Sequence, residues 1–148
     1  MRLSIAVAVS LAALACQQEP LDEPSAMDDG GVAATIEALT APPETGCAVA
    51  TFGGNEYWFC TQAKAWSTAR TRCQSAGLDL ARIESAAENT FVTANLPANA
   101  WVGANDQTTE GAWRWVDNNT QFWSGAASGS AVSGRYASWA SGQPDNSS

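Results

Sequence analysis

All seven tryptophans of this chain lie beyond residue 46, which confines any hydrophobic core to the segment from there onward. Residues 17–45 hold no aromatic side chain, no Lys and no Arg, and they include seven acidic residues. A segment of this composition cannot bury enough apolar area to offset the entropy cost of ordering it. We therefore predict a solvated acidic linker over residues 17–45 and one domain over residues 46–148.

The net charge of −8 belongs mainly to the linker, since residues 46–148 carry eight acids against six bases. The acidity therefore says little about the ligand of the domain. The chain contains no histidine, which excludes Ser-His-Asp and Cys-His catalysis and His-ligated zinc. It also lacks a glycine-rich phosphate loop and a basic patch, so we expect no nucleic-acid partner.

Residues 1–16 have the pattern of an export signal. Arg2 supplies a positive start, and Leu3–Ala15 is an apolar run broken only by two serines. Thirteen helical residues at about 1.5 Å each cannot cross a hydrocarbon core of roughly 30 Å. The run therefore predicts a cleaved signal peptide rather than a membrane span or a buried core helix.

The end of this signal resembles the lipobox of bacterial lipoproteins. Cys16 follows Ala13-Leu14-Ala15, where the leucine stands one position later than is usual. The resemblance implies that Cys16 becomes a lipidated mature N-terminus, which attaches a protein to a membrane without spanning it. With Gln17 after it, this implies an outer-membrane or cell-surface lipoprotein. The alternative is a plain signal peptide and a secreted protein.

The domain begins with a predicted hairpin between Cys47 and Cys60. Phe52–Asn55 reads as a turn and Glu56–Phe59 as a strand. In an exported protein the two cysteines are disulfide candidates, and the alternatives are free thiols or other partners.

Two helices are predicted next. In Lys64–Ala76, apolar residues recur at helical spacing, and Gly77 ends the segment. The second helix runs from Ser85 to about Leu96. In its capping box the Ser85 hydroxyl accepts from the Glu88 amide while Glu88 returns a bond. Glu88 and Asn89 could be ligands, but a cap and a surface amide are the favoured interpretation.

Two strands and a long loop follow. Residues 101–104 and 112–116 read as strands, and Trp113 and Trp115 share one face of the second. Such a pair belongs either to a core, which we favour, or to a platform for carbohydrate stacking. Residues 117–134 read as a loop long enough to be functional or disordered.

The stretch Tyr136–Asn146 combines two aromatic anchors, a glycine turn and an amide-proline-carboxylate run. Its side-chain oxygens suit a hard cation better than they suit catalysis. Taken alone, the run Gly142–Asn146 also fits an ordinary surface turn.

The order of these segments resembles the C-type lectin-like domain over essentially all of residues 47–146. The matching pieces are Cys47–Cys60, Trp66-x-x-Ala69-Arg70-x-x-Cys73, Gly77-x-x-Leu80-Ala81, Ile83-x-Ser85-x-x-Glu88-Asn89-x-Phe91-Val92, Trp101-Val102-Gly103-Ala104, Glu110-Gly111-x-Trp113-x-Trp115-Val116-Asp117 and Trp139-x-x-Gly142-Gln143-Pro144-Asp145-Asn146. The resemblance implies an α+β fold with two helices, a small antiparallel sheet and a long ligand-binding loop.

The resemblance also implies a ligand site. Gln143, Asp145 and Asn146 would bind Ca²⁺ and the sugar hydroxyls, with Pro144 in the cis form. Gln-Pro-Asp is the galactose-type signature of the family, where mannose-type members carry Glu-Pro-Asn. We therefore expect a calcium-dependent module that binds a galactose-like glycan or glycoprotein.

The sequence departs from the family in several ways. Family members continue past this point with a Trp-Asn-Asp motif, two more cysteines and the last strands of the sheet, so the domain reads as incomplete. Cys73 is then left without its family partner. Asp117 and Asn105-Asp106 are possible auxiliary calcium ligands, although turn roles are favoured. The tryptophan that often follows Gln-Pro-Asp is absent, since Ser147 and Ser148 follow Asn146.

Three functions compete. The leading one is the calcium-dependent, galactose-type lectin described above. The second is a lectin-like module that binds protein, or an inactive fragment with an incomplete calcium site. The third and least favoured is a glycosidase that uses a carboxylate pair among Glu88, Glu110 and Asp117, so we expect no enzyme.

Overall fold

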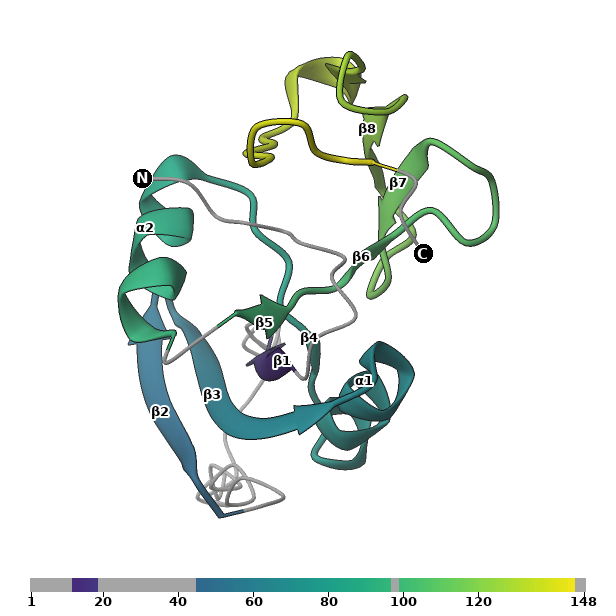
Figure 1. The fold of residues 1–148 in the computed structure, drawn as a ribbon. Helices are drawn as coiled ribbons and strands as arrows, with labels where there is room; N and C mark the ends of the chain where they lie inside the picture. Colours follow the sequence, from purple (N-terminus) through teal and green to yellow (C-terminus); the bar gives the residue numbers. More distant parts are fainter. Residues whose placement is uncertain (1–11, 19–44, 97–98, 146–148) are drawn as a thin grey trace, which may run out of the picture.

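The computed structural model describes residues 12–18, 45–96 and 99–145 (Figure 1). In chain order its elements are β1 (Ala12–Gln18), β2 (Cys47–Phe52), β3 (Asn55–Lys64), α1 (Trp66–Ser75), β4 (Asp79–Leu80), α2 (Ala86–Asn95), β5 (Ala100–Trp101), β6 (Ala104–Asn105), β7 (Ala112–Trp115), β8 (Gln121–Ser124), β9 (Ser130–Ala131) and the 3₁₀ turn η1 (Val132–Gly134). The predicted α+β class, with two helices and small antiparallel sheets, is confirmed. Neither helix in this described part is long and apolar enough to cross a membrane.

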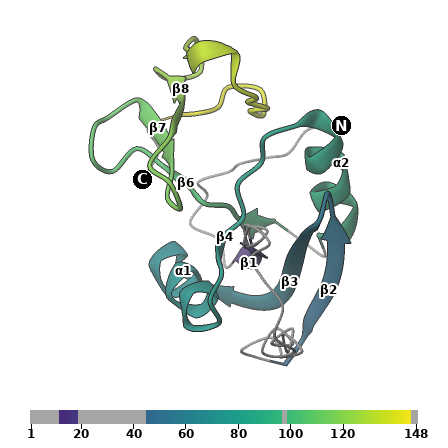
Figure 2. The same ribbon diagram turned by 180° about the vertical axis from the view of Figure 1, so that it is seen from behind.

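The strands form two sheets. One has the order β2-β3-β1-β4 with β5 also beside β1, and the other has the order β6-β7-β8-β9. The pairs are antiparallel except for β1 and β5, which run parallel. Seen from both sides, the second sheet and the C-terminal stretch lie at one end of the molecule (Figures 1 and 2). Helix α1 and the β2–β3 hairpin lie toward the other end, and α2 lies along one side.

The predicted hairpin is present. Gly53 and Gly54 make its turn with φ of +60° and +87°, and two consecutive positive φ values are what a tight twisted hairpin requires. The turn sets a register that places Cys47 opposite Cys60. These two cysteines form a disulfide, as predicted.

Strand β1 comes from the end of the segment expected to be a signal peptide and from Gln17 and Gln18, which were expected to belong to the solvated linker. It lies between β3 on one side and β4 on the other (Figure 2). The carbonyl of Ala15 accepts from the amide of Ala81 at 2.8 Å, and Gln17 Oε1 accepts from the amide of Arg82 at 3.0 Å. Ala15 and Cys16 are fully buried. An apolar run suits a buried strand as well as it suits the core of a signal peptide, because both require water-avoiding side chains.

Cys16 forms a disulfide with Cys73 of α1, across a sequence separation of 57 residues. Cys73, which the sequence left without its family partner, is therefore paired with Cys16 instead. A sulfur atom in a disulfide cannot also carry a thioether-linked lipid. In this structure Cys16 thus serves as a core residue, and lipidation describes a different covalent state of the chain.

The two helices were predicted with small errors at their ends. Helix α1 begins at Trp66 rather than Lys64, and it buries Ala69 and Cys73 against the sheet. Gly77 follows it with φ of +77°, as a residue after a helix C-terminus often does. Helix α2 begins after Ser85, whose hydroxyl accepts from the Glu88 amide at 3.1 Å as predicted.

The other half of the capping box differs from the prediction. Glu88 Oε2 accepts from the amide of Glu84 at 2.8 Å rather than from that of Ser85. Its Oε1 accepts from the Tyr57 hydroxyl at 2.7 Å, so the side chain is buried between α2 and β3. Asn89 is also buried, at 5% exposed, and the prediction of a surface amide was wrong. Both residues are buried, a placement that only the tertiary packing of α2 determines.

The second half of the domain is more regular than expected. Residues 117–134 are not one loop, because they contain β8, β9 and η1. Residues 101–104 form two short strands instead of one, with Gly103 between β5 and β6. Trp113 and Trp115 are both buried, which confirms that they belong to the core.

Candidate ligand-binding site

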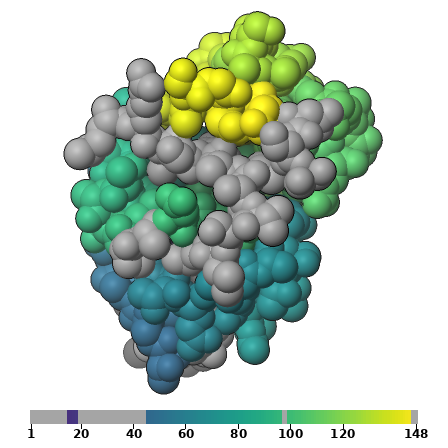
Figure 3. Space-filling model, in the orientation of Figure 1, coloured from purple at the N-terminus to yellow at the C-terminus, as the bar shows by residue number. Residues whose placement is uncertain are grey.

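The C-terminal stretch is anchored by the half-buried Trp139. Its ring lies 4.8 Å from that of Trp113, 5.9 Å from that of Phe122 and 6.2 Å from that of Trp123, between ring centroids. Contacts with three aromatic rings fix the direction in which the chain leaves the core. Figure 3 shows the stretch, in yellow, on the surface next to the second sheet.

The turn beyond Trp139 presents two side chains. Gly142 has φ of +84°, and the Gln143 amide donates to the carbonyl of Ala140 at 3.0 Å. The Gln143–Pro144 peptide is cis, as the resemblance implied. Pro144 is fully buried, while Gln143 is half-buried and Asp145 is exposed. The buried proline thus holds the turn while its two polar neighbours reach solvent.

Gln143 and Asp145 are held close together. Gln143 Oε1 accepts a hydrogen bond from the amide of Asp145 at 3.2 Å. An amide oxygen has a second lone pair, so this bond orients the side chain and leaves it able to accept again. The third predicted ligand, Asn146, lies outside the described residues.

The donors of this turn fit calcium in kind. Ca²⁺ takes oxygen ligands from carboxylates and amides, in a shell of about six to eight. Among residues 12–18, 45–96 and 99–145 no three acidic, cysteine or histidine side chains gather into a metal-binding group. Gln143 and Asp145 would therefore supply part of a calcium shell, and most of its oxygens would come from elsewhere.

A family model for the Lectin C-type domain matches residues 62–148. The chain belongs to the C-type lectin domain family. C-type lectin domain family 4 member F of Mus musculus is 38% identical over 96 residues, which is 64% of this chain and 16% of that protein. Asialoglycoprotein receptor 1 of Rattus norvegicus is 33% identical over 96 residues, or 64% of this chain and 29% of the receptor.

A third relative is similar over more of its length. The Perlucin-like protein of Mytilus galloprovincialis is 31% identical over 121 residues, which is 78% of this chain and 70% of that protein. The chain spans less than a third of the two mammalian relatives above. A search of solved structures found no match.

The auxiliary ligands considered for this C-type lectin domain have structural roles instead. An Asp117 carboxylate oxygen pairs with Arg82 at 3.0 Å. Asn105 Oδ1 accepts from the amide of Gln107, and Asp106 Oδ2 accepts from the amide of Gly111, so both stabilise the turn before β7. Asp117 Oδ1 also accepts from the amide of Asn118 in the turn after β7, so the favoured interpretation of all three residues as turn formers is confirmed.

The three carboxylates of the glycosidase hypothesis lie in unlike surroundings. Glu88 is buried beneath α2 with Tyr57, Glu110 is exposed on the turn before β7, and Asp117 is paired with Arg82. A glycosidase needs two carboxyl groups facing one substrate from opposite sides. These environments give no support to such a pair.

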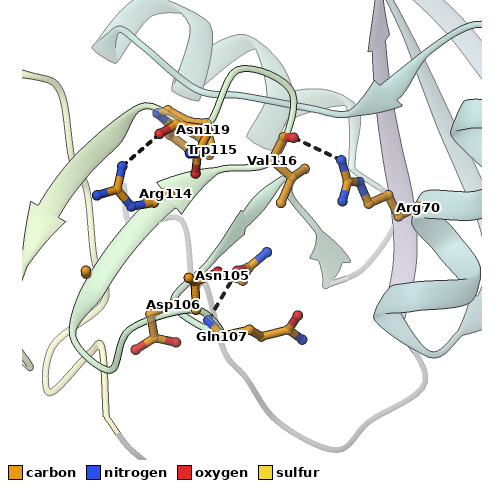
Figure 4. A pocket seen from close by; sticks show the side chains of 10 residues that line it. Arg70, Asn105, Asp106, Gln107, Arg114, Trp115, Val116 and Asn119 are labelled. Atoms are coloured by element: carbon orange, nitrogen blue, oxygen red, sulfur yellow. Dashed lines mark hydrogen bonds between the residues drawn. The ribbon is translucent and has the colours of Figure 1, made fainter.

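A polar pocket of about 280 Å³ was not predicted. It lies between α1, the turn after β6 and the outer face of β7 (Figure 4). Its lining comes from chain segments well separated in sequence: Arg70, Asn105–Thr108, Ala112, Arg114–Val116 and Asn119. In the sequence, only the polar run Asn105–Thr108 indicated a polar surface here. The position of Arg70 in the pocket depends on how α1 packs, which the sequence does not reveal.

A second cavity lies beneath the C-terminal stretch. It holds only about 10 Å³ and is lined by Asn89, Tyr136 and five further residues. Asn89 Oδ1 is buried and finds no hydrogen-bond partner among the described residues. A cavity of this size accommodates about one water molecule, so it suits a structural water rather than a ligand.

Proposed function

We propose that this C-type lectin domain binds carbohydrate through the turn Gly142–Asp145. The observation that carries the proposal is that the half-buried Gln143 and the exposed Asp145 stand on either side of the buried Pro144. Trp139 anchors this turn to the aromatic core, and an anchored turn loses little conformational entropy when it binds a ligand. Membership of a family of carbohydrate binders supports the same function.

The proposed site uses Ca²⁺, held by Gln143, Asp145 and Asn146. When bound, the ion would supply a positive centre to which sugar hydroxyls can coordinate. The protein side chains would orient the hydroxyls by hydrogen bonds. The glutamine and aspartate in this order make the site galactose-type, so the proposed partner is a glycan or glycoprotein with galactose-like sugars.

Retention on galactose resin tests this function. In buffer with Ca²⁺ the purified chain is expected to bind, and EDTA or free galactose is expected to release it. Gln143→Ala should abolish retention, whereas Gln62→Ala, an exposed amide on β3, should not. Retention that survives EDTA in full would contradict the calcium mechanism.

The second candidate is a lectin-like module that binds protein, or an inactive domain whose calcium site is incomplete. It is favoured by the absence of a cluster of metal-binding side chains in the described part of the chain. Calorimetric titration with Ca²⁺ separates the two. Heat of binding and a raised melting temperature support the lectin, because a ligand that binds only the folded state stabilises it. No heat and no shift at millimolar Ca²⁺ support the second candidate.

We further propose that the protein is exported and not an enzyme, with residues 17–45 as a tether. In a lipidated form Cys16 would be its anchor at the outer membrane or cell surface. That form excludes the Cys16–Cys73 disulfide and lacks residues 1–15. Intact mass of the protein from its native host distinguishes the two states, since one carries lipid on Cys16 and the other retains the N-terminus with Cys16 oxidised.

A further inference from the structure

The polar pocket beside β7 has no assigned role in the proposed calcium site. None of its lining residues belongs to the turn Gly142–Asp145. Figure 4 shows Arg114 and Arg70 on two sides of it, Asn105, Asp106 and Gln107 along a third, and Asn119 with Trp115 and Val116 above.

The charged side chains of the pocket are held in place by the protein itself. Arg114 donates to the carbonyl of Asn119 at 2.9 Å and to Gln121 Oε1 at 3.3 Å. Asp106 Oδ2 accepts from the amide of Gly111 at 3.0 Å. Each bond uses only part of what the group offers, because a guanidinium has five N–H donors and a carboxylate about four acceptor sites. Both residues therefore remain able to bind a ligand without first reorganising.

Arg70 is fixed in the same way. It forms a two-pronged ion pair with Asp79, and one of its nitrogens also donates to the carbonyl of Val116 at 2.9 Å. The carboxylate of Asp79 balances the positive charge of Arg70. Arg70 therefore adds a hydrogen-bond donor to the pocket but little net positive charge. The remaining charges are those of Arg114 and Asp106, which balance each other overall.

Asp106 and Arg114 both line the pocket, and among the described residues they form no ion pair with each other. The Asp106 carboxylate would repel an anion, and the Arg114 guanidinium would repel a cation. A neutral ligand that both donates and accepts hydrogen bonds is repelled by neither charged group. Hydroxyl groups have this property, since each donates one hydrogen bond and accepts two.

The volume of the pocket further limits the kind of ligand that it could bind. About 280 Å³ lies at the lower limit of small-molecule pockets, which span roughly 300–1,000 Å³. This volume suits one sugar ring rather than an oligosaccharide. The amides of Asn105, Gln107 and Asn119 complete a lining that is mostly polar.

We propose that this pocket is a second, calcium-independent subsite for a neutral monosaccharide unit, with Asp106 and Arg114 as its principal ligands. The inference deepens the proposed function, because it rests on carbohydrate as the ligand of the domain. It differs in mechanism, since the polar side chains bind the hydroxyls directly and no metal ion takes part.

The test is a titration of the full chain with D-galactose and, separately, D-glucose in buffer containing EDTA, followed by ¹H–¹⁵N NMR. Binding is expected at millimolar sugar with at least one of them. The resonances of Arg114 to Val116 and of Asn105 to Thr108 should shift. Shifts confined to residues outside the pocket, or no shifts with either sugar, would overturn the proposal.

Two variants locate the binding, and two matched variants control for charge. Asp106→Asn keeps an oxygen that can accept from Gly111, and Arg114→Met keeps an aliphatic stem of similar length. Each is expected to weaken the EDTA-resistant binding about tenfold or more, as the loss of a charge-assisted hydrogen bond does. Glu110→Gln, on the same turn, and Arg72→Met, on the exposed side of α1, should bind like the wild type.

The two sites fail independently in these measurements. Loss of retention on galactose resin in Ca²⁺, with EDTA-resistant shifts intact, would contradict the calcium site and leave the pocket supported. Unchanged affinity in both Asp106→Asn and Arg114→Met, with native circular dichroism, would contradict the pocket alone.

Discussion

The ring of Trp139 meets the ring of Trp113 edge-on, with centroids 4.8 Å apart and an interplanar angle of 67°. This contact ties the C-terminal stretch to the second sheet. Trp113 is buried in β7, so the contact transmits the rigidity of the sheet to the turn that follows Trp139. The turn Gly142–Asp145 is therefore placed by aromatic packing as much as by its own sequence.

Replacing Trp139 with alanine tests this anchoring. The change removes contacts with three rings, and for a half-buried tryptophan we expect a loss of about 2–3 kcal/mol in the free energy of unfolding. Urea denaturation measures it, with Trp139→Phe as the control that retains one ring. Galactose retention should fall further in Trp139→Ala than in Trp66→Ala, because Trp66 belongs to α1 and packs against a different hydrophobic cluster from that of Trp139. Equal retention in both would contradict the anchoring role.

The two disulfides should stabilise the uncleaved chain unequally. In the chain-entropy model, closing the loop of 57 residues between Cys16 and Cys73 contributes about 4 kcal/mol. The loop of 13 residues between Cys47 and Cys60 contributes about 3 kcal/mol. Cys73→Ser should therefore lower the urea midpoint more than Cys47→Ser, measured without reductant. The reverse order would show that β1 is not held in the sheet in solution.

Tyr57→Phe removes the hydroxyl that donates to Glu88 Oε1 at 2.7 Å. The carboxyl group of Glu88 is buried, so it loses a partner that water cannot easily replace. We expect a loss of about 2 kcal/mol in unfolding free energy. Tyr136→Phe, whose hydroxyl makes no such bond among the described residues, should cost less than 1 kcal/mol, roughly the scale of an ordinary surface change. Similar losses of unfolding free energy in the two variants would mean that the hydrogen bond from Tyr57 to Glu88 does not stabilise the fold.

Gly103→Ala should be strongly destabilising. A Cβ atom at this position would lie 2.5 Å from the carbonyl oxygen of Leu80. The backbone cannot easily move away, because Gly103 donates to the carbonyl of Ala81 and accepts from the amide of Val116, both at 2.8 Å. We expect a loss of about 3 kcal/mol by thermal or urea denaturation.

Gly54→Ala is the comparison for Gly103→Ala. Its Cβ would meet no atom within 4 Å, so only the positive φ of +87° opposes it. That conformational penalty is about 1–2 kcal/mol. A Gly103→Ala variant as stable as Gly54→Ala would contradict the close approach of β4 to the β5–β6 link.

Local signals predicted much of this fold. Gly53-Gly54 specifies the hairpin turn, and Ser85 specifies the start of α2, because each acts on backbone groups within a few residues. The alternation of Trp113 and Trp115 placed them on one face of a strand, and the core that we favoured for that face is confirmed. These features depend on neighbours in sequence, so a sequence can reveal them.

Other features depend on distant partners and could not be predicted. The pairing of Ala12–Gln18 with β3 and β4 involves residues far along the chain, so the apolar pattern of this segment could not reveal it. Asn89 looks like a surface residue until α2 packs on the sheet. The pocket needs Arg70 and Arg114 together, although 44 positions separate them. The resemblance placed Gln143 and Asp145 on one turn, and the structure does place them there.

The most direct test of the central proposal is retention of Asp145→Asn and Glu110→Gln on galactose resin in the presence of Ca²⁺. Both changes remove one exposed carboxylate, and only Asp145 belongs to the proposed site. We predict that Asp145→Asn passes through unretained while Glu110→Gln elutes with the wild type and is released by EDTA. Retention of Asp145→Asn at wild-type strength would contradict the proposal that the turn Gly142–Asp145 binds the sugar.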